Sequence, residues 1–376
     1  MSDLGYMEKL LDGVEVEWID IKDLCDVITT GKLNANAMED DGIYPFFTCN
    51  EYPYKINSYA FDLEAILISG NGSQVGHLNY YNGKFNAYQR TYVIGDFKDN
   101  VKVMYFFYYL NHTLKNYITK NSRKGSVPYI TMPMLENFKI PIPSLNVQAE
   151  IVRILDVFTE LTAELTAELV ARKQQYEYYR DQLLTFKEGE VDWKALGSLA
   201  ENLDSKRKPI TSGLRESGSI PYYGASGIVD YVKDYIFDGD YLLISEDGAN
   251  LTARNTPIAF SISGKNWVNN HAHVLKFETY AERRYVEYYL NSIELTPYIS
   301  GAAQPKLNQK NLNSIKIPSP SLKEQERIVA ILDKFDTLTT SLTEGLPREI
   351  ELRQQQYEYY RELLLSFPKA EVADHD

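Results

Sequence analysis

The hydrophobic positions that follow residue 145 recur at the spacing of a long helix. Intervals of three and four residues alternate there, which is the seam pattern of a coiled coil. About forty residues follow the pattern, and a helix of that size is roughly 60 Å long. A single apolar stripe needs a partner helix to cover it. The stripe is formed by Ile151, Ile154, Phe158, Leu161 and Leu165, and it continues less regularly through Leu169, Tyr176 and Leu183.

A near-copy of the end of this helix occurs later in the chain. Residues 172–186 read RKQQYEYYRDQLLTF and residues 353–367 read RQQQYEYYRELLLSF, with eleven of the fifteen positions identical. The start is repeated too, as PIPSLNVQAEIVRILDVF at residues 141–158 and PSPSLKEQERIVAILDKF at residues 318–335. The chain is therefore an internal duplication. We expect the two helical arms to pair in antiparallel orientation.

The two arms differ in their centre. Residues 162–169 of the first arm are a tandem repeat of TAEL. Each four-residue unit adds roughly 6 Å and about 40° of rotation to a helix. The second arm has Gly345-Leu346-Pro347 instead. Because proline disfavours a helix interior, we predict a kink or break there.

Two blocks precede the arms and contain short β-type runs separated by turn signals. The expected fold class is α+β: two mixed α/β domains joined by two long antiparallel coiled-coil helices, in a pseudo-twofold internal repeat. Each block closes on a proline-rich extended run, after which Ser144 or Ser321 is placed to cap the helix that follows. The predicted elements are strands at residues 65–69 and 89–94 and a helix at 101–116, then strands at 241–245, 258–263 and 272–277 and a helix at 281–293.

These patterns divide the chain into five parts. The repeat is cyclic, because residues 1–15 resemble the tail of a helical arm and the end of an arm precedes each block. We expect residues 1–15 to complete the distal helical repeat, 16–145 to form the first block, 146–190 the central spacer helix, 191–322 the second block, and 323–376 the distal spacer helix and tail.

The net charge of −13 argues at first against a nucleic-acid partner. However, the first block contains 12 Lys and Arg against 13 Asp and Glu, and the second contains 14 against 14. The excess negative charge therefore lies almost entirely outside the blocks, and charge alone does not decide. Two cysteines without CxxC spacing and the lack of a long apolar run lead us to expect a cytoplasmic protein.

The duplicated proline-rich helix starts with Gln148 and Glu324-Gln325, the QQYEYYRDQLL sequence and the TAEL tandem together resemble the specificity (S) subunits of type I restriction–modification systems. The resemblance covers nearly the whole chain. It implies that each block is a target recognition domain that reads one half of a bipartite, asymmetric double-stranded DNA site. It also implies that the helices set the spacing, with the number of TAEL copies fixing the gap, and dock two methyltransferase (M) subunits.

The same resemblance implies that the chemistry belongs to other subunits. S-adenosylmethionine, ATP and Mg²⁺ are expected on the M subunits and on restriction/translocase (R) subunits that join through them, with no cofactor in this chain. The sequence agrees, since it contains no NPPY tetrapeptide, no Walker A motif and no paired acidic nuclease motif. Two alternatives stay open: a self-contained DNA-modifying enzyme, and a coiled-coil adaptor that binds proteins without reading DNA sequence.

The candidate DNA-binding residues are polar and charged side chains within or beside the predicted strands and in the loops between them. Gly70-Asn71-Gly72 misses the GxGxxG spacing of a dinucleotide loop, so a DNA-facing turn or a plain hairpin is expected. His271 and His273 lie two apart in an expected strand and should therefore face the same way. They suit DNA contact or structural hydrogen bonding better than a metal. Tyr88 and Arg90 align with them in the first block. The lysine-rich loops fit phosphates or are simply solvated. The DNA-binding candidates are Ser69, Asn71, Ser73, Gln74, Lys84, Tyr88, Arg90, Lys120, Arg123, Lys124, Ser126, Lys206, Arg207, Asp247, Asn250, Arg254, His271, His273, Gln304 and Lys306.

The repeated tyrosines suit a different role. Three tyrosines within four residues cannot all face one coiled-coil seam, so some of them are expected to contact a partner subunit. The candidates for partner binding are Tyr176, Tyr178, Tyr179, Tyr357, Tyr359 and Tyr360. We assign no catalytic, cofactor-binding or metal-ligating residue to this chain.

Overall fold

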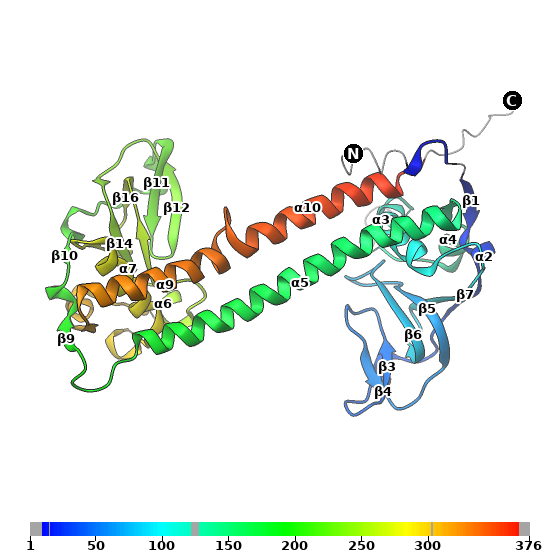
Figure 1. Ribbon diagram of the computed structural model, residues 1–376, viewed down its shortest axis with the longest axis horizontal. Helices are drawn as coiled ribbons and strands as arrows, with labels where there is room; N and C mark the ends of the chain where they lie inside the picture. The colour runs from blue at the N-terminus through cyan, green and yellow to red at the C-terminus, as the bar shows by residue number, and fades with distance from the viewer. Residues whose placement is uncertain (1–9, 15, 122–127, 302–303, 368–376) are drawn as a thin grey trace. The chain divides into compact units, whose positions relative to one another are not determined.

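The structure is a computed structural model that describes residues 10–14, 16–121, 128–301 and 304–367. The chain forms two compact units (Figure 1). The first unit contains the residues up to 164 and those from 350 onward, and the second contains residues 165–349. Among the residues that the structure describes, no helix has both the length and the hydrophobicity needed to cross a bilayer.

The first block is a six-stranded sheet with helices on one face. The strand order is β2-β7-β5-β6-β3-β4, and a separate two-stranded sheet pairs β1 with β8. The elements are β1 Glu17–Asp20, α2 Ile21–Leu24, β2 Cys25–Thr30, the 3₁₀ turn Ala35–Ala37, β3 Tyr44–Phe47, β4 Tyr54–Ile56, β5 Phe61–Ser69, β6 Leu78–Ala87, β7 Thr91–Phe97, α3 Val103–Asn121, α4 Met132–Glu136 and β8 Lys139–Ile142.

The central strand β5 is buried on both faces. Ile66 and Ile68 pack with α3 in one hydrophobic cluster, while Ala65 and Leu67 pack with Phe85 and others in a second cluster on the opposite face. Alternate residues of a strand point to opposite faces, so a continuous apolar run suits a strand between two cores. Full burial of an Ile or Leu side chain contributes about 1.5–3 kcal/mol.

The second block repeats this topology with two strands divided, since β13 and β14 together match β5, and β15 and β16 together match β6. Strand β14 takes the place of β5, between β17 and β15, and β11 pairs in parallel with β16 as β3 does with β6. The elements are β9 Asp192–Ala195, β10 Glu201–Asn202, β11 Ser217–Gly224, β12 Gly227–Val232, β13 Phe237–Asp238, β14 Tyr241–Ser245, α6 Asn250–Ala253, β15 Ala259–Ile262, β16 Lys265–Val268, β17 Ala272–Lys276, α7 Tyr280–Ser292, α8 Gln309–Ser314, β18 Lys316–Ser319, and 3₁₀ turns at Leu196–Ser198, Asp204–Lys206, Ser212–Leu214 and Thr296–Tyr298.

The long helix α5, Leu145–Leu184, has 40 residues, as the hydrophobic spacing predicts. In the first unit its Phe158 ring lies 5.2 Å from the ring of Tyr360 in α10, Gly345–Leu365. In the second unit the Tyr179 ring of α5 stacks on Phe335 of α9, Leu322–Thr340, at 5.8 Å. The tail of each arm thus packs on the head of the other, which confirms the antiparallel pairing.

The predicted break in the second arm is present. Helix α9 ends at Thr340, α10 begins at Gly345, and Gly345 has φ of 75°. A positive φ is readily adopted only by glycine. The Ser341 hydroxyl accepts hydrogen bonds from the backbone N–H groups of Thr343 and Glu344, which supports the new helix start. Ser321 caps α9 as predicted, through the N–H of Glu324.

Candidate nucleic-acid interface

Three segments of the first block meet after the end of β5. The Gly70 N–H donates to the Arg90 carbonyl at 2.9 Å, and the Ile130 N–H donates to the Gly70 carbonyl at 2.9 Å. The Tyr92 hydroxyl donates to the Ile130 carbonyl at 2.8 Å. We call these four residues the first junction. It joins the turn after β5, the start of β7 and the segment that leads to α4.

The second block contains the same junction with different side chains. The Glu246 N–H donates to the His271 carbonyl at 2.9 Å, and the Leu307 N–H donates to the Glu246 carbonyl at 2.7 Å. His273 Nε2 lies 2.7 Å from the Leu307 carbonyl oxygen. We call these four residues the second junction.

The two junctions define which candidate residues are equivalent. Arg90 matches His271, and Tyr92 matches His273. The sequence comparison, which aligned Tyr88 and Arg90 with the two histidines, is therefore wrong by two residues. The turn between β5 and β6 (residues 70–77) is shorter than its counterpart between β14 and β15 (residues 246–258), and this difference in length changes the offset between the two blocks.

Several predicted residues surround the first junction and are accessible. Arg90 and Ser73 are exposed, and Asn71, Gln74 and Tyr88 are half-buried. Lys120 is exposed in the last turn of helix α3. Ile118 and Lys115 of this helix lie against Gly76, which belongs to the turn after β5. These side chains gather at one edge of the block. The predictions Arg123, Lys124 and Ser126 fall outside the described residues.

Two other candidates are not part of this exposed edge. Ser69 is buried, and its hydroxyl has no hydrogen-bond partner in the structure. Lys84 is exposed but pairs across the β5–β6 hairpin with Asp62, at the end away from the turn, and its ammonium lies over the Tyr59 ring at 4.7 Å. Lys84 is therefore separated from the first junction along the hairpin.

The second junction also exposes polar side chains. His271 is 51% exposed, and its Nδ1 lies 2.9 Å from both carboxylate oxygens of Asp247. Lys306 is 51% exposed and pairs with Glu246 Oε1 at 3.1 Å. Gln304 and Lys206 are exposed as well. This edge thus presents both charges, in contrast to Arg90 and Lys120 of the first block.

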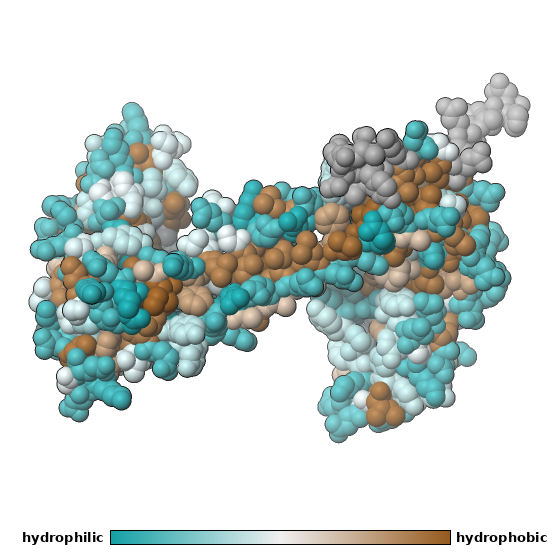
Figure 2. Space-filling view, in the orientation of Figure 1, coloured by the Kyte–Doolittle hydropathy of each residue, from teal (hydrophilic) through white to brown (hydrophobic). Residues whose placement is uncertain are grey.

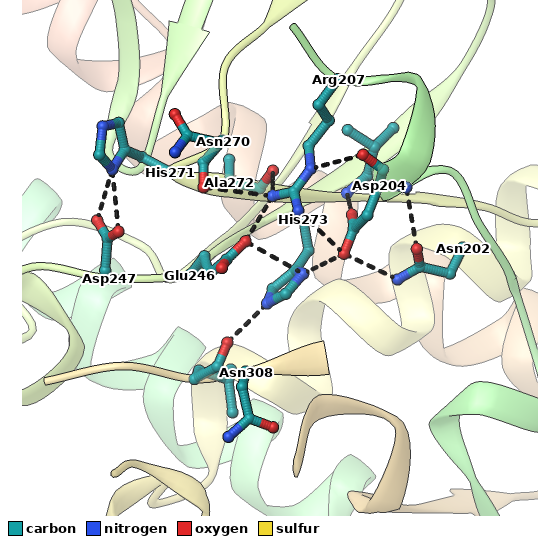
Figure 3. A network of polar contacts seen from close by, with 12 residues as sticks. Asn202, Asp204, Arg207, Glu246, Asp247, Asn270, His271, Ala272, His273 and Asn308 are labelled. Atoms are coloured by element: carbon teal, nitrogen blue, oxygen red, sulfur yellow. Dashed lines mark hydrogen bonds and ion pairs between the residues drawn. The ribbon is translucent and has the colours of Figure 1, made fainter. Parts of the chain in front are cut away.

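Other predicted residues of the second block hold the block together. Arg207 donates to Glu246 Oε2 at 2.5 Å and to the Ala272 carbonyl at 2.8 Å (Figure 3). Arg254 donates to the Ile293 carbonyl at 2.6 Å, and burial lowers its pKa. The Asn250 side chain bonds both to the N–H and to the carbonyl of Thr256. These three side chains thus form their hydrogen bonds within the protein.

His271 and His273 do not share a site. His271 precedes β17 and faces Asp247, whereas His273 lies within β17, is 1% exposed and faces Asp204. The alternation rule that predicted a common direction applies only inside a strand. Figure 3 shows the two rings directed to different carboxylates.

Asp204 and Glu246 complete the network around His273. Burial raises the pKa of each carboxyl, but the hydrogen bonds and charges of His273 and Arg207 outweigh it, so both pKa values are lowered. Asp204, Glu246 and His273 lie close enough to ligate a metal. The atoms that would ligate a metal are already bonded to Arg207, Lys306 and the Leu307 carbonyl. Among the described residues, the arrangement therefore favours a charge-paired network over a cation site.

Each YEYY sequence divides its tyrosines between the core and the surface. Tyr176 and Tyr357 are half-buried, and Tyr179 and Tyr360 lie against Phe335 and Phe158. The middle tyrosines are the most exposed, Tyr178 at 62% and Tyr359 at 54%. Figure 2 shows hydrophobic side chains, in brown, along the surface of these helices.

Comparison with known proteins shows which family this chain belongs to. The family model described as "Type I restriction modification DNA specificity domain" matches residues 13–172 and 190–352. The chain belongs to this family. It is a DNA specificity subunit of the type I restriction–modification class. Each match contains one block and the first part of the helical arm that follows it.

Similar proteins are named as specificity subunits. The specificity subunit of the EcoR124I/EcoR124II type I restriction enzyme from Escherichia coli is 36% identical, with 100% of both chains covered. A putative type I restriction enzyme specificity subunit of Haemophilus influenzae is 34% identical over 96% of this chain and 98% of its own. The crystal structure of an S subunit from M. genitalium has the same fold, with a TM-score of 0.65, 17% identity, and coverage of 95% of this chain and 98% of that chain.

Proposed function

We propose that the two junctions carry the DNA-reading surfaces of this specificity subunit, each for one half of a bipartite site. One observation carries the proposal. The same backbone hydrogen bonds build both junctions, while the side chains around them differ in charge and shape. A shared scaffold with unlike exposed groups suits the reading of two unlike half-sites, so the site is asymmetric.

The exposed members of each junction are the proposed direct contacts. Arg90 suits a guanine edge or a phosphate, and Lys120 suits a phosphate. Around the second junction His271, Lys306 and Gln304 take the same part. Ser69, Arg207, Arg254 and His273 are buried or internally bonded, and we assign them a supporting role.

The chain itself is proposed to be non-catalytic. It would join two M subunits through its helices, and R subunits through the M subunits, in a cytoplasmic complex. S-adenosylmethionine, ATP and Mg²⁺ would act on those partners. A solved structure of similar fold, 15% identical with a TM-score of 0.56, is titled as an account of complex assembly and conformational transition of the type I R-M system.

Arg90→Ala tests the assignment of the first junction. We expect the assembled complex to lose about 1–3 kcal/mol of binding free energy for its site, with weaker discrimination in the first half-site only. Quantitative binding to DNA duplexes with single changes in either half measures this effect. Lys84→Ala is the matched control, because Lys84 is an exposed cation of the same block away from the junction. Equal losses for both variants would remove the assignment.

Tyr178→Ala combined with Tyr359→Ala tests the proposed M-subunit contacts. Both rings are exposed, so the fold should keep its thermal stability while co-purification of M subunits falls about tenfold or more, as for aromatic interface residues. Phe335→Ala is the contrasting variant, since it removes a ring that packs inside the second unit. Undiminished co-purification of the double variant would rule out this docking surface.

A further inference from the structure

His273 is a buried histidine whose two ring nitrogens both face acceptors. Nδ1 lies 2.6 Å from Asp204 Oδ2, and Nε2 lies 2.7 Å from the Leu307 carbonyl oxygen. A carbonyl oxygen only accepts hydrogen bonds, so Nε2 carries a proton.

The Nδ1 side gives the same result. Asp204 Oδ1 accepts from the Val274 N–H at 2.9 Å, and Oδ2 accepts from the Asn202 amide at 3.2 Å and lies 3.4 Å from Arg207. A carboxyl group surrounded by donors is an ionised acceptor, so Nδ1 must donate as well. His273 is therefore a doubly protonated imidazolium.

The charged groups around the ring balance this proton. Asp204 comes from the 3₁₀ turn after β10, Arg207 from the residue after that turn, and Glu246, 3.8 Å from Nδ1, from the end of β14. Lys306 approaches Glu246 from the loop before α8. In the buried part, two carboxylates face two cations, Arg207 and His273, and the half-exposed Lys306 lies at the edge.

The imidazolium holds a loop in place. Leu307 directly follows the loop that carries Gln304 and Lys306, and its N–H is bound by the carbonyl of Glu246. Glu246 in turn precedes Asp247, the partner of His271. In the first block the equivalent bond comes from the Tyr92 hydroxyl. Burial raises the pKa of the Tyr92 hydroxyl, so the group that makes this hydrogen bond in the first block is uncharged at physiological pH.

We propose that His273, in its doubly protonated form, is a positioning residue that fixes the DNA-facing loops of the second block, making the second half-site alone sensitive to pH. The functional part rests on the proposed function of these loops. When the imidazolium loses a proton, one ring nitrogen becomes an acceptor that faces another acceptor. The bond to Asp204 or to Leu307 is then lost, and the loop loosens.

The protonation state can be tested without DNA. In the full chain with ¹⁵N-labelled histidine, NMR should show both nitrogens of His273 protonated at neutral pH. Hydrogen-exchange protection of the Leu307 amide should be lower at alkaline pH than at neutral pH, while that of the equivalent Ile130 amide stays constant. A neutral His273 ring at neutral pH would overturn the proposal. So would a shift of the Nδ1 or Nε2 signal on addition of Zn²⁺, because it would show that the ring binds a metal.

The consequence for recognition is tested in the complete methyltransferase complex. The wild type should lose about tenfold or more in affinity for the second half-site at alkaline pH, the effect expected for loss of a charge-assisted hydrogen bond. The profile is also measured in His271→Asn, which removes the exposed histidine of the same edge. Because His271 is itself a proposed DNA contact, only the dependence of the affinity on pH is compared between this variant and the wild type. Discrimination in the first half-site should not change with pH.

A variant built on the first block sharpens this test. Thr30 pairs with Tyr92 in the β2–β7 register, and the β10–β17 register continued by two residues places Asp204 opposite His273, so the two pairs are equivalent. Asp204→Thr with His273→Tyr should therefore flatten the pH profile, and Tyr92→Phe should weaken the first half-site equally at all pH values. A pH profile that persists in the double variant overturns the proposal. If the wild type reads no bipartite site at any pH, the proposed function fails, whereas the NMR result still decides the state of His273.

Discussion

Deletion of residues 166–169 is expected to abolish recognition of the original DNA site and to create a new one. The deletion removes one TAEL unit from α5, which shortens the helix by roughly 6 Å and rotates it by about 40°. One base pair of B-DNA rises about 3.4 Å. The gap between the half-sites should therefore shrink by about one to two base pairs, with both half-sites unchanged.

Methylation of a library of duplexes with gaps of different length measures this change. The original gap should lose about 100-fold or more of its methylation rate, because both halves cannot be engaged together. The matched control is Thr166→Ala with Glu168→Ala, which alters two exposed side chains and keeps the length of the helix. A deletion variant that still prefers the original gap would show that α5 does not set the spacing.

Arg207→Ala is expected to cost about 3–5 kcal/mol of stability in the second unit, the loss seen when one partner of a buried ion pair is removed. The side chains of Arg207, Asp204 and Glu246 are all at least 87% buried, as their exposures are 13%, 7% and 12%. The variant leaves two carboxylates with one buried cation, His273. Native-state hydrogen exchange in the second unit measures the loss. Lys206→Ala, an exposed neighbour in the same turn, should have little effect.

The pH dependence gives this prediction a sign. The folded pKa values of Asp204 and Glu246 are lowered, so their contribution is present above the unfolded values of about 4 and is lost as pH falls through the folded values. In Arg207→Ala the penalty should therefore be largest at neutral pH and shrink in acid, where protonated carboxyls need no cation. A penalty independent of pH would contradict the network.

Elements with a local signal could be predicted from the sequence. The strand at residues 241–245 agrees with β14, and the helix at 281–293 differs from α7 by one residue at each end. Helix α3 continues five residues past the predicted end because Ile118 is buried in the core. Asn82-Gly83 is a typical turn sequence, yet strand β6 continues through Gly83 at φ 129°. At the equivalent Gly264 the strand does divide.

Only part of the candidate site could be predicted from the sequence. The exposed Arg90 and His271 each directly precede an apolar strand, β7 and β17, which is a local cue. Asp204 and Glu246 were not among the predicted residues, because Asp204 lies 69 positions from His273 and only the sheet brings them together. The internal repeat was the signal that could have found them. In the correct register Tyr92 and His273 occupy equivalent positions, and a buried tyrosine at that position predicts a buried hydrogen-bond partner for the histidine.

Single-molecule methylome sequencing tests the central claim most directly. Cells would express the methyltransferase subunits with this chain, without it, or with residues 191–322 exchanged for the second block of a relative. We predict one split, asymmetric methylated motif that disappears without the chain and changes in only one half after the exchange. Methylation that is indifferent to this chain, or an exchange that alters both halves, would contradict the account.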